Sequence, residues 1–362
     1  MKAKSLILSI IMFISCFSSL CYGEILKTES LLTPAQEVVQ NINVGWNLGN
    51  TLDSHNNGYG GLSVDATEKY WGNPVTTEKL FKDIKAAGFN AVRIPVTWQE
   101  HIQSDGKIDP LWMNRVKAVA DMSLNEGLYT IINIHHDKWV IPSYAQYENV
   151  KTKMNNIWSQ VAAEFSEYDN RIIFEGFNEP RLIGMNEEWT GNSAAYEIVN
   201  KLNITFINCI RSSGGKNRER VLMIGTYCNG VSENILSAMT VPNDNKIIVT
   251  VHAYTPYNFA LNQYGTNYWS SKNTADTYEI DNTMELINKY FVSKGIPVII
   301  GEFGAMNKGN DSCRIDWAKY YKAAAEKYGI KCFVWDDGGN FKLYDRYSGA
   351  WTNNELLKAI VS

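Results

Sequence analysis

The chain has 362 residues, a formal net charge of −4 and a pI near 5.8, so it lacks the excess of basic residues that nucleic-acid binding requires. A hydrophobic fraction of 45% can fill one large barrel or two medium domains. The 11 Trp and 20 Tyr exceed what a core needs, and their flat rings with polar edges suit stacking against the faces of sugars.

The first 23 residues have the pattern of a signal peptide. Lys2 and Lys4 precede a short apolar stretch, and small residues before Glu24 predict cleavage at that point. The apolar stretch is too short to span a bilayer, and we expect no later membrane span. Residues 24–362 are then one domain of a secreted, extracellular protein. The imperfect lipoprotein box that ends at Cys16 leaves a lipid-anchored protein on the cell surface or in the periplasm as the alternative.

Short β-rich runs then alternate with amphipathic helical segments. We expect strands at residues 43–48, 91–95, 129–135, 172–178, 221–225, 247–252, 298–302 and 332–336. Helical patterns between them include residues 76–88, 111–127 and 313–329, the first of which opens with a threonine suited to capping.

Eight βα units with nearly continuous apolar strands predict an α/β fold, a closed (β/α)₈ TIM barrel. An open doubly wound sheet is the runner-up, but the phosphate-binding GxGxxG pattern that it needs after the first strand is missing. We expect the long irregular stretches at residues 55–73 and 257–275 to form walls of a cleft on the C-terminal face of the barrel.

Four cysteines follow the leader, at positions 209, 228, 313 and 332. They have no CxxC spacing, which argues against a zinc site. One or two disulfides are compatible with an exported protein, and buried free thiols are equally compatible, so the state of Cys209, Cys228, Cys313 and Cys332 stays open.

The ends of the predicted strands carry polar or aromatic residues that a barrel would bring to one mouth. These residues are Asn47, Asn50, Asp53, Arg93, His135, His136, Asn178, Glu179, His252, Tyr254, Glu302 and Trp335. The adjacent histidines followed by Asp137 suggest metal ligands, but neighbours on a strand point to opposite sides. We therefore expect no metal and no other cofactor.

Two of these residues, Glu179 and Glu302, form the pair that hydrolysis of a glycosidic bond requires. One carboxyl group must be protonated to donate to the leaving oxygen, and the other must be ionised to attack or to activate water. Each glutamate lies where an apolar run gives way to polar residues and a turn.

The motifs around these positions resemble glycoside hydrolase family 5, and within it the bacterial and rumen-type endoglucanases of subfamily four. In chain order they are GWNLGNTLD, WGNP, GFNAVRIPVTW, INIHHD, FNEP, VHAYTPYNF, IGEFG and VWDDG, and they cover essentially all of the chain after the leader. One position departs from the family pattern, because Asp337 stands where members commonly carry Asn. The catalytic pair is untouched, but hydrogen bonds near the glycone subsites would change.

The family is retaining, so the resemblance implies that Glu179 is the acid/base and Glu302 the nucleophile. We expect Arg93 and Tyr254 beside Glu302, and we expect the charge of Glu302 to raise the pKa of Glu179. Asn178 would donate to the sugar 2-hydroxyl, and Trp335 would form the floor of the subsite where cleavage occurs. The remaining support residues are Asn50, Asp53, His135, His136 and His252. Trp71 and Trp98 fit either the cleft or the core, and His101 is a further candidate for the cleft.

The resemblance predicts a secreted, monomeric endo-β-1,4-glucanase that hydrolyses internal bonds of cellulose or β-glucan by double displacement. Its partner is then a β-glucan polysaccharide, not a nucleic acid. Xyloglucanase, xylanase or mannanase activity on the same scaffold is the nearest alternative, because one catalytic apparatus serves several backbones through changes in loops. A non-catalytic glycan-binding barrel is the alternative from another class.

Overall fold

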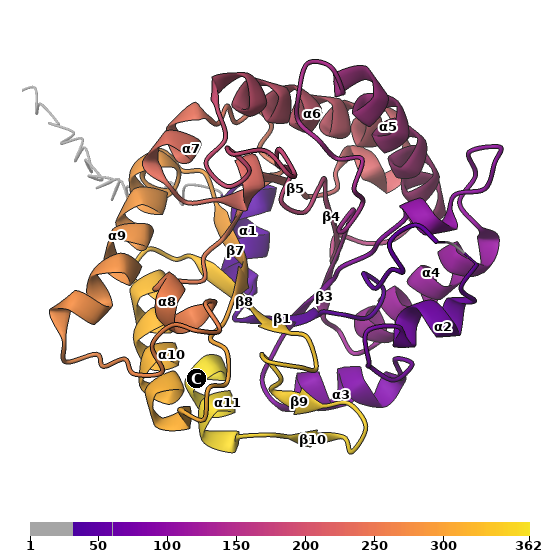
Figure 1. Ribbon diagram of the computed structural model, residues 1–362. Coiled ribbons are helices and arrows are strands. Elements are labelled where there is room, and N and C mark those ends of the chain that lie inside the picture. Colours follow the sequence, from indigo (N-terminus) through magenta and orange to yellow (C-terminus); the bar gives the residue numbers. More distant parts are fainter. Residues whose placement is uncertain (1–31, 60) are drawn as a thin grey trace, which may run out of the picture. The chain divides into compact units, whose positions relative to one another are not determined.

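The computed structural model describes residues 32–59 and 61–362, so the predicted signal peptide and the lipoprotein box at Cys16 lie outside the described residues. Eight parallel strands close into one barrel in sequence order, and helices surround it (Figure 1). The predicted (β/α)₈ fold is confirmed, and the open doubly wound sheet is wrong. In the described part of the chain, every helix falls short of the length and apolarity that a membrane crossing needs.

The barrel strands follow the apolar runs of the sequence. They are β1 (Gly45–Leu48), β2 (Ala91–Ile94), β3 (Tyr129–Asn133), β4 (Ile172–Glu175), β5 (Leu222–Gly225), β6 (Ile247–His252), β7 (Val298–Phe303) and β8 (Lys331–Asp336). Strands β3 and β4 end earlier than predicted, so His135 and Glu179 lie on the segments that follow these strands. Those segments have more conformational freedom than a pleated strand, and they decide where the two side chains point.

The helices fill the intervals between the strands. They are α1 (Pro34–Asn41), α2 (Val64–Lys69), α3 (Glu78–Ala86), α4 (Pro110–Asn125), α5 (Tyr147–Glu164), α6 (Ser193–Ser212), α7 (Glu233–Ala238), α8 (Tyr257–Ala260), α9 (Thr274–Tyr290), α10 (Asp311–Glu326) and α11 (Asn354–Val361). A short hairpin of β9 (Tyr344–Asp345) and β10 (Ala350–Trp351) precedes the last helix. The three helices predicted at residues 76–88, 111–127 and 313–329 are confirmed as α3, α4 and α10.

Two details of the prediction are wrong. The N-cap of α3 is Thr77, and its side chain makes no capping hydrogen bond. The stretches at residues 55–73 and 257–275 are not irregular throughout, because they contain α2 and α8.

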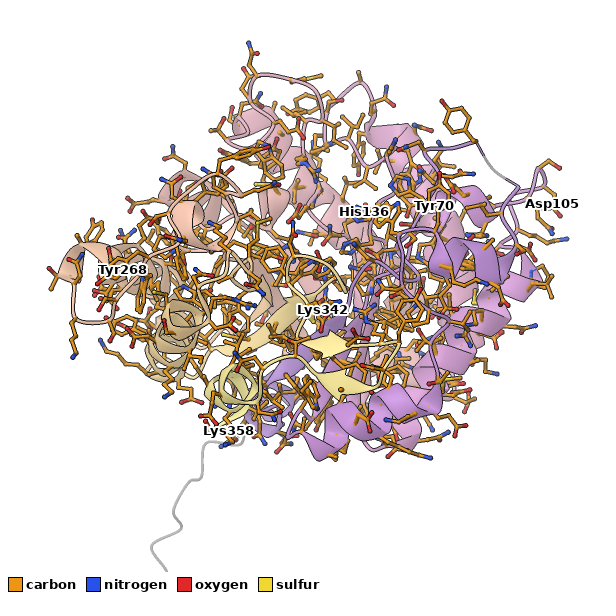
Figure 2. All side chains as sticks on the ribbon, turned by 60° about the horizontal axis from the view of Figure 1, so that its bottom comes forward. Tyr70, Asp105, His136, Tyr268, Lys342 and Lys358 are labelled. Atoms are coloured by element: carbon orange, nitrogen blue, oxygen red, sulfur yellow. The ribbon has the colours of Figure 1, made fainter. Side chains whose placement is uncertain are left out.

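The apolar side chains form two layers that hold the mouth of the barrel in place. The larger layer lies between strands and helices and includes Trp158, Phe174 and Phe206. The smaller layer fills the barrel interior, where Ile131 and Ile299 pack in one cluster with Val38 of α1. Charged side chains such as Asp105 and Lys358 lie exposed at the periphery (Figure 2). With its interior filled by apolar side chains, the barrel offers its C-terminal mouth for chemistry.

Candidate active site

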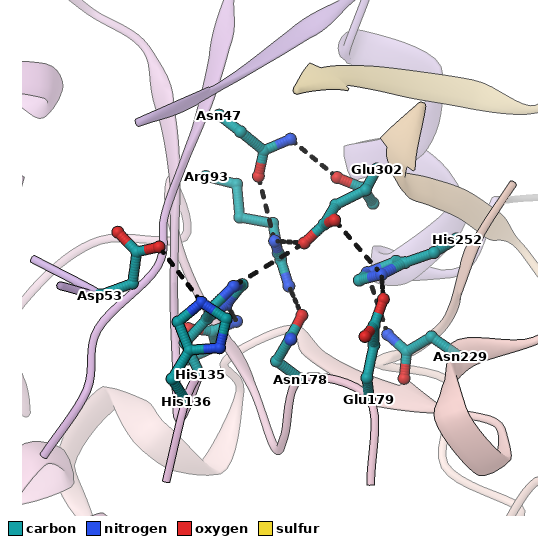
Figure 3. Close-up of polar contacts among 12 residues, drawn as sticks. Asn47, Asp53, Arg93, His135, His136, Asn178, Glu179, Asn229, His252 and Glu302 are labelled. Carbon is teal, nitrogen blue, oxygen red and sulfur yellow. Dashed lines mark hydrogen bonds and ion pairs between the residues drawn. The ribbon is translucent and has the colours of Figure 1, made fainter. Parts of the chain in front are cut away.

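Glu179 and Glu302 both lie beside Nδ1 of His252 at the C-terminal mouth of the barrel (Figure 3). Glu302 belongs to β7, whereas Glu179 follows β4 in a left-handed backbone conformation with a φ of 42°. One carboxylate oxygen of each lies within 4.8 Å of the other. Retaining glycosidases hold the two carboxyl groups about 5 to 5.5 Å apart and inverting ones about 6.5 to 9.5 Å, so this spacing favours a retaining mechanism.

Glu302 is held as an acceptor of hydrogen bonds at both oxygens. Nη1 of Arg93 donates to Oε1 at 2.8 Å, and the hydroxyl of Tyr254 donates to Oε2 at 2.8 Å. Burial, followed by the charge of Glu302, raises the pKa of Tyr254 well above its usual value, so the phenol keeps its proton. These donors stabilise the ionised form of Glu302 and fix the direction of its lone pairs. The sequence placed both residues correctly.

Arg93 connects the nucleophile candidate to three other side chains. Its Nε donates to Glu175 at 2.7 Å, and its Nη1 and Nη2 donate to the carboxamide oxygens of Asn47 and Asn178 at 3.0 and 2.8 Å. Burial lowers the pKa of Arg93, but the charges of Glu175 and Glu302 outweigh burial and raise it. Because the oxygen of Asn178 faces Arg93, its NH₂ group is left to donate to a ligand.

The predicted direction of the pKa shift of Glu179 is wrong. Burial raises the pKa, but the hydrogen bond with His252 and the charge of Arg181 outweigh burial, so the pKa lies below that of an ordinary glutamic acid. Nδ1 of His252 lies 2.9 Å from Oε1 of Glu179, and Nη1 of Arg181 lies 3.3 Å from Oε2. The predicted rise depended on the charge of Glu302, but His252 and Arg181 have the larger effect on the pKa of Glu179.

The adjacent histidines both belong to the mouth. Strand β3 ends at Asn133, and the rings of His135 and His136 lie 4.4 Å apart, so the expectation that they point to opposite sides is wrong. Nε2 of His136 lies 3.5 Å from Oδ2 of Asp53. This oxygen also accepts a hydrogen bond from the backbone of Asn50, and Oδ1 of Asp53 accepts one from the backbone of Thr51. Asn50 is part of this turn, where its backbone has a φ of 55°.

Two sets of side chains could each offer three ligand atoms to a metal ion, and within each set these atoms lie within 4.8 Å of one another. One is Asp53 with His135 and His136, and the other is Glu179 with His252 and Glu302. Both sets belong to the mouth, where each group already has a hydrogen-bond or ion-pair partner within the protein. The expectation of no metal stays a prediction.

Trp335 has the position expected of a platform for a sugar ring. Its indole is half-buried and runs parallel to the ring of His135, at a centroid distance of 5.8 Å and an angle of 4°. A Cβ atom at Gly49 would lie 2.7 Å from the indole, so glycine is required there for the indole to lie flat. The backbone of the loop after β1 therefore helps to determine the position of the Trp335 indole.

The remaining aromatic candidates divide between the mouth and the core. Trp71 is half-buried and contacts the rings of His55 and His136, at 5.0 and 5.3 Å between centroids. Trp98 is fully buried, and its Nε1 donates to the carbonyl of Asn133, which makes it a core residue. His101 stacks on Trp112 at 3.8 Å, where burial lowers its pKa to about 4. The idea that His101 reaches the cleft is wrong.

The mouth opens into a cleft of about 520 Å³ that contains residues that the sequence did not single out. Glu179, Glu302, His252 and Trp335 line it together with Trp189, which is 58% exposed, and Tyr257. The guanidinium of Arg181 stacks on the indole of Trp189 at 4.5 Å. Arg181 directly follows the FNEP motif, but only the left-handed turn at Glu179 brings it back to the carboxylate. No spacing in the sequence signals that contact.

Two further expectations from the sequence concern the cysteines and Asp337. Cys209, Cys228, Cys313 and Cys332 are all free thiols in the structure, so the alternative of disulfides among them is wrong. Oδ1 of Asp337 accepts hydrogen bonds from the backbone of Gly339 and Phe341, at 2.7 and 3.0 Å. The carboxylate of Asp337 therefore stabilises the turn after β8.

Comparison with known proteins adds a family match. The family model described as cellulase (glycosyl hydrolase family 5) matches residues 52–340. Endoglucanase A of Clostridium longisporum is 42% identical over an alignment that covers 90% of this chain and 65% of that protein, so the chain spans slightly less than two thirds of that relative.

Two solved structures share the fold closely. The structure titled as a GH5-4 broad specificity endoglucanase from Ruminococcus champanellensis with bound cellotriose is 40% identical and has a TM-score of 0.88, covering 91% of this chain and 99% of that one. A GH5 xyloglucan-specific endo-β-1,4-glucanase from a metagenomic library, in complex with cellotriose, is 36% identical with a TM-score of 0.86, covering 90% of this chain and 98% of that one.

Proposed function

The chain belongs to glycosyl hydrolase family 5, and from this premise we propose that it is a retaining endo-β-1,4-glucanase in which Glu302 is the nucleophile and Glu179 the acid/base. The observation that carries the proposal is the pair of carboxylates within 4.8 Å of each other, one of them held as an acceptor by Arg93 and Tyr254. The unequal surroundings of the two groups support this assignment of roles.

In the first step, a carboxylate oxygen of Glu302 attacks the anomeric carbon while the bond to the leaving oxygen breaks. Glu179 gives its proton to that oxygen, which departs as a hydroxyl group. The NH₂ group of Asn178 donates to the sugar 2-hydroxyl, and Trp335 supports the face of the ring. The result is a glycosyl ester of Glu302 and an ionised Glu179.

In the second step, water attacks the anomeric carbon, Glu179 accepts its proton, and Glu302 leaves as a carboxylate. Esterification has removed the charge of Glu302 from the site, so ionised Glu179 now faces His252 and Arg181 without a second anion nearby. The hydrogen bond with His252 and the charge of Arg181 stabilise the ionised form of Glu179 at the stage when a base is needed. Glu179 is therefore available in its carboxylate form, which the second step requires.

Cellulose and mixed-linkage β-glucan are the proposed substrates, because relatives of the chain are named endoglucanases and one was solved with cellotriose. Xyloglucan is the second candidate, because the xyloglucan-specific relative is 36% identical over 90% of this chain. The experiment is a panel of carboxymethylcellulose, barley glucan, xyloglucan, xylan and mannan, with a Glu302→Gln protein as the inactive control. Release of reducing sugar from the first two substrates supports the proposal. Hydrolysis of xylan or mannan alone would contradict it.

We also propose that the protein is exported, which rests on the signal-peptide pattern of the first 23 residues. Sequencing the mature N-terminus tests this. A protein that begins at Glu24 supports free secretion, whereas a lipid-modified Cys16 would mean an anchored protein.

A further inference from the structure

Asn229 lies next to His252 (Figure 3) and contacts its Nε2, whereas the two glutamates lie near its Nδ1. It ends the short 3₁₀ turn Tyr227–Asn229 that follows β5, the one strand to which the sequence assigned no site residue. Its side chain is fully buried, and its Nδ2 lies 3.1 Å from Nε2 of His252. Through the imidazole, Asn229 is connected to Oε1 of Glu179, which lies 2.9 Å from Nδ1.

The direction of the hydrogen bond between Asn229 and His252 decides which nitrogen of His252 carries the proton, and so the direction of the hydrogen bond between His252 and Glu179. An amide NH₂ group only donates, so Nε2 of His252 must be the unprotonated acceptor. A neutral imidazole carries its proton on the other nitrogen, which is Nδ1. Nδ1 then donates to Oε1 of Glu179, because Oε2 of Glu302 lies 3.6 Å from Nδ1 and is too distant for a good hydrogen bond.

We propose that Asn229 is a positioning residue that keeps His252 neutral with its proton on Nδ1, and thereby lets Glu179 hold its acid proton on Oε2. A doubly protonated His252 would place a positive charge 2.9 Å from Glu179 and hold that carboxylate ionised. The donor N–H of Asn229 opposes that state, since it leaves no acceptor for a proton on Nε2. Because Oε1 accepts from Nδ1, a proton on Glu179 resides on Oε2. The inference rests on the proposed function.

The backbone of the turn places the amide where a regular strand end would not. Cys228 and Asn229 have φ values of 44° and 48°, in the left-handed region that few residues other than glycine, Asn and Asp adopt readily. Oδ1 of Asn229 has no hydrogen-bond partner among the residues that the structure describes. The side chain of Asn229 therefore makes its hydrogen bond with His252, and the turn places it there.

Several other groups influence the proton on Glu179 and must stay unchanged in a test. These groups come from the segments that pack against Glu179. They are Arg181, Cys228, His136, Tyr254 and Glu302, in addition to His252. A variant at Asn229 leaves all of them in place.

The test compares two variants with a matched control. Asn229→Gly removes the amide without straining the left-handed backbone, and Asn229→Asp replaces the donor by an acceptor of the same shape. Asn57→Gly is the control, because Asn57 has a φ of 65° and an exposed side chain. Each protein is assayed with aryl β-cellobiosides that carry a good leaving group, dinitrophenol, or a poor one, phenol.

Asn229→Gly is expected to lower kcat/KM for the phenyl substrate by about tenfold and for the dinitrophenyl substrate by less than about threefold, since only the poor leaving group needs a proton in the first step. Asn229→Asp favours a proton on both nitrogens of His252, so its loss is larger. The basic limb of the pH profile for the phenyl substrate reports loss of the proton from Glu179. This limb moves to lower pH in the order wild type, Asn229→Gly, Asn229→Asp. Asn57→Gly behaves like the wild type.

A ¹⁵N spectrum of the five histidines reports the tautomer without any assay of activity, and a His252→Gln sample assigns the signal. Unprotonated Nε2 and protonated Nδ1 in the wild type support the inference. A proton on Nε2, or equal losses with both leaving groups, would overturn it. A wild-type protein that hydrolyses none of the β-glucans would instead refute the proposed function.

Discussion

Oε2 of Glu175 lies 2.7 Å from Nε of Arg93, and neither side chain is exposed to solvent. The same guanidinium donates to Glu302, so one buried cation serves two buried carboxylates. Glu175 therefore limits how completely Arg93 neutralises Glu302. A nucleophilic carboxylate must be ionised, yet it must also retain electron density for attack, and sharing Arg93 meets both requirements.

Glu175→Gln tests this relationship. The substitution keeps the shape and an acceptor for Arg93 but removes the charge, so Arg93 neutralises Glu302 more completely. We expect the first step to slow by about tenfold with a dinitrophenyl cellobioside, which corresponds to about 1.4 kcal/mol. Glu68→Gln is the matched control, because Glu68 is also buried and pairs with Arg115 at 2.9 Å outside the cleft. Equal kinetic effects of the two substitutions would contradict the special role of Glu175.

Glu179→Ala should slow the first step far more for poor leaving groups than for good ones, since a good leaving group needs little protonation. Its second step should be slow for every substrate, because the base is missing. Pre-steady-state kinetics across a series of aryl cellobiosides measures both steps. A first step that loses the same factor across the series would remove Glu179 from the acid role.

Trp335→Ala should lower kcat/KM by about tenfold or more, because alanine cannot supply the face on which a sugar ring stacks. The melting temperature should change little, since the indole lies at the mouth and is only partly buried. Trp98→Ala is the contrasting control, because that indole is fully buried and its loss should cost about 3–5 kcal/mol of stability. A collapse of Tm in Trp335→Ala, with normal activity in the folded fraction, would make Trp335 structural.

The fold and much of the mouth followed from the sequence because both depend on local pattern. Apolar runs of four to six residues separated by helical periodicity give a parallel barrel, and the ends of such strands must meet at its mouth. Arg93, Tyr254 and Glu302 were predictable for that reason, since each lies on a strand or close to the end of one.

The residues that the sequence missed depend on features that local pattern does not carry. Asn229 reaches His252 from a left-handed turn, and Arg181 reaches Glu179 by folding back past another one. The pKa of Glu179 was predicted in the wrong direction because it depends on distances to these groups rather than on spacing along the chain. Glu175 differs from Asn229 and Arg181, since a charged residue within an apolar strand needs a buried partner and is therefore visible in the sequence.

His101 should make the protein sensitive to mild acid. Burial lowers its pKa to about 4 from an ordinary value of 6.5, and its Nε2 has no hydrogen-bond partner in the described part of the chain. The unfolded chain therefore takes up a proton at a higher pH than the folded one. Stability is full above pH 6.5 and falls towards pH 4, by up to about 3 kcal/mol.

His101→Phe keeps the stacking on Trp112 but cannot be protonated, so its stability should depend less on pH. Thermal unfolding of both proteins at pH 7 and pH 4.5 checks this. The prediction fails if the gap in Tm between the two pH values is the same with and without the histidine.

The proposed mechanism requires that Glu302 forms a covalent bond to the sugar. A 2,4-dinitrophenyl 2-deoxy-2-fluoro-β-cellobioside tests it most directly, because fluorine slows both steps while the good leaving group restores only the first, so that the glycosyl-enzyme accumulates. Digestion and mass spectrometry then locate the sugar. We predict a fluorocellobiosyl ester on the carboxylate of Glu302 and none on Glu179. A label on Glu179, or no label together with a product of inverted anomeric configuration, would contradict the proposed mechanism.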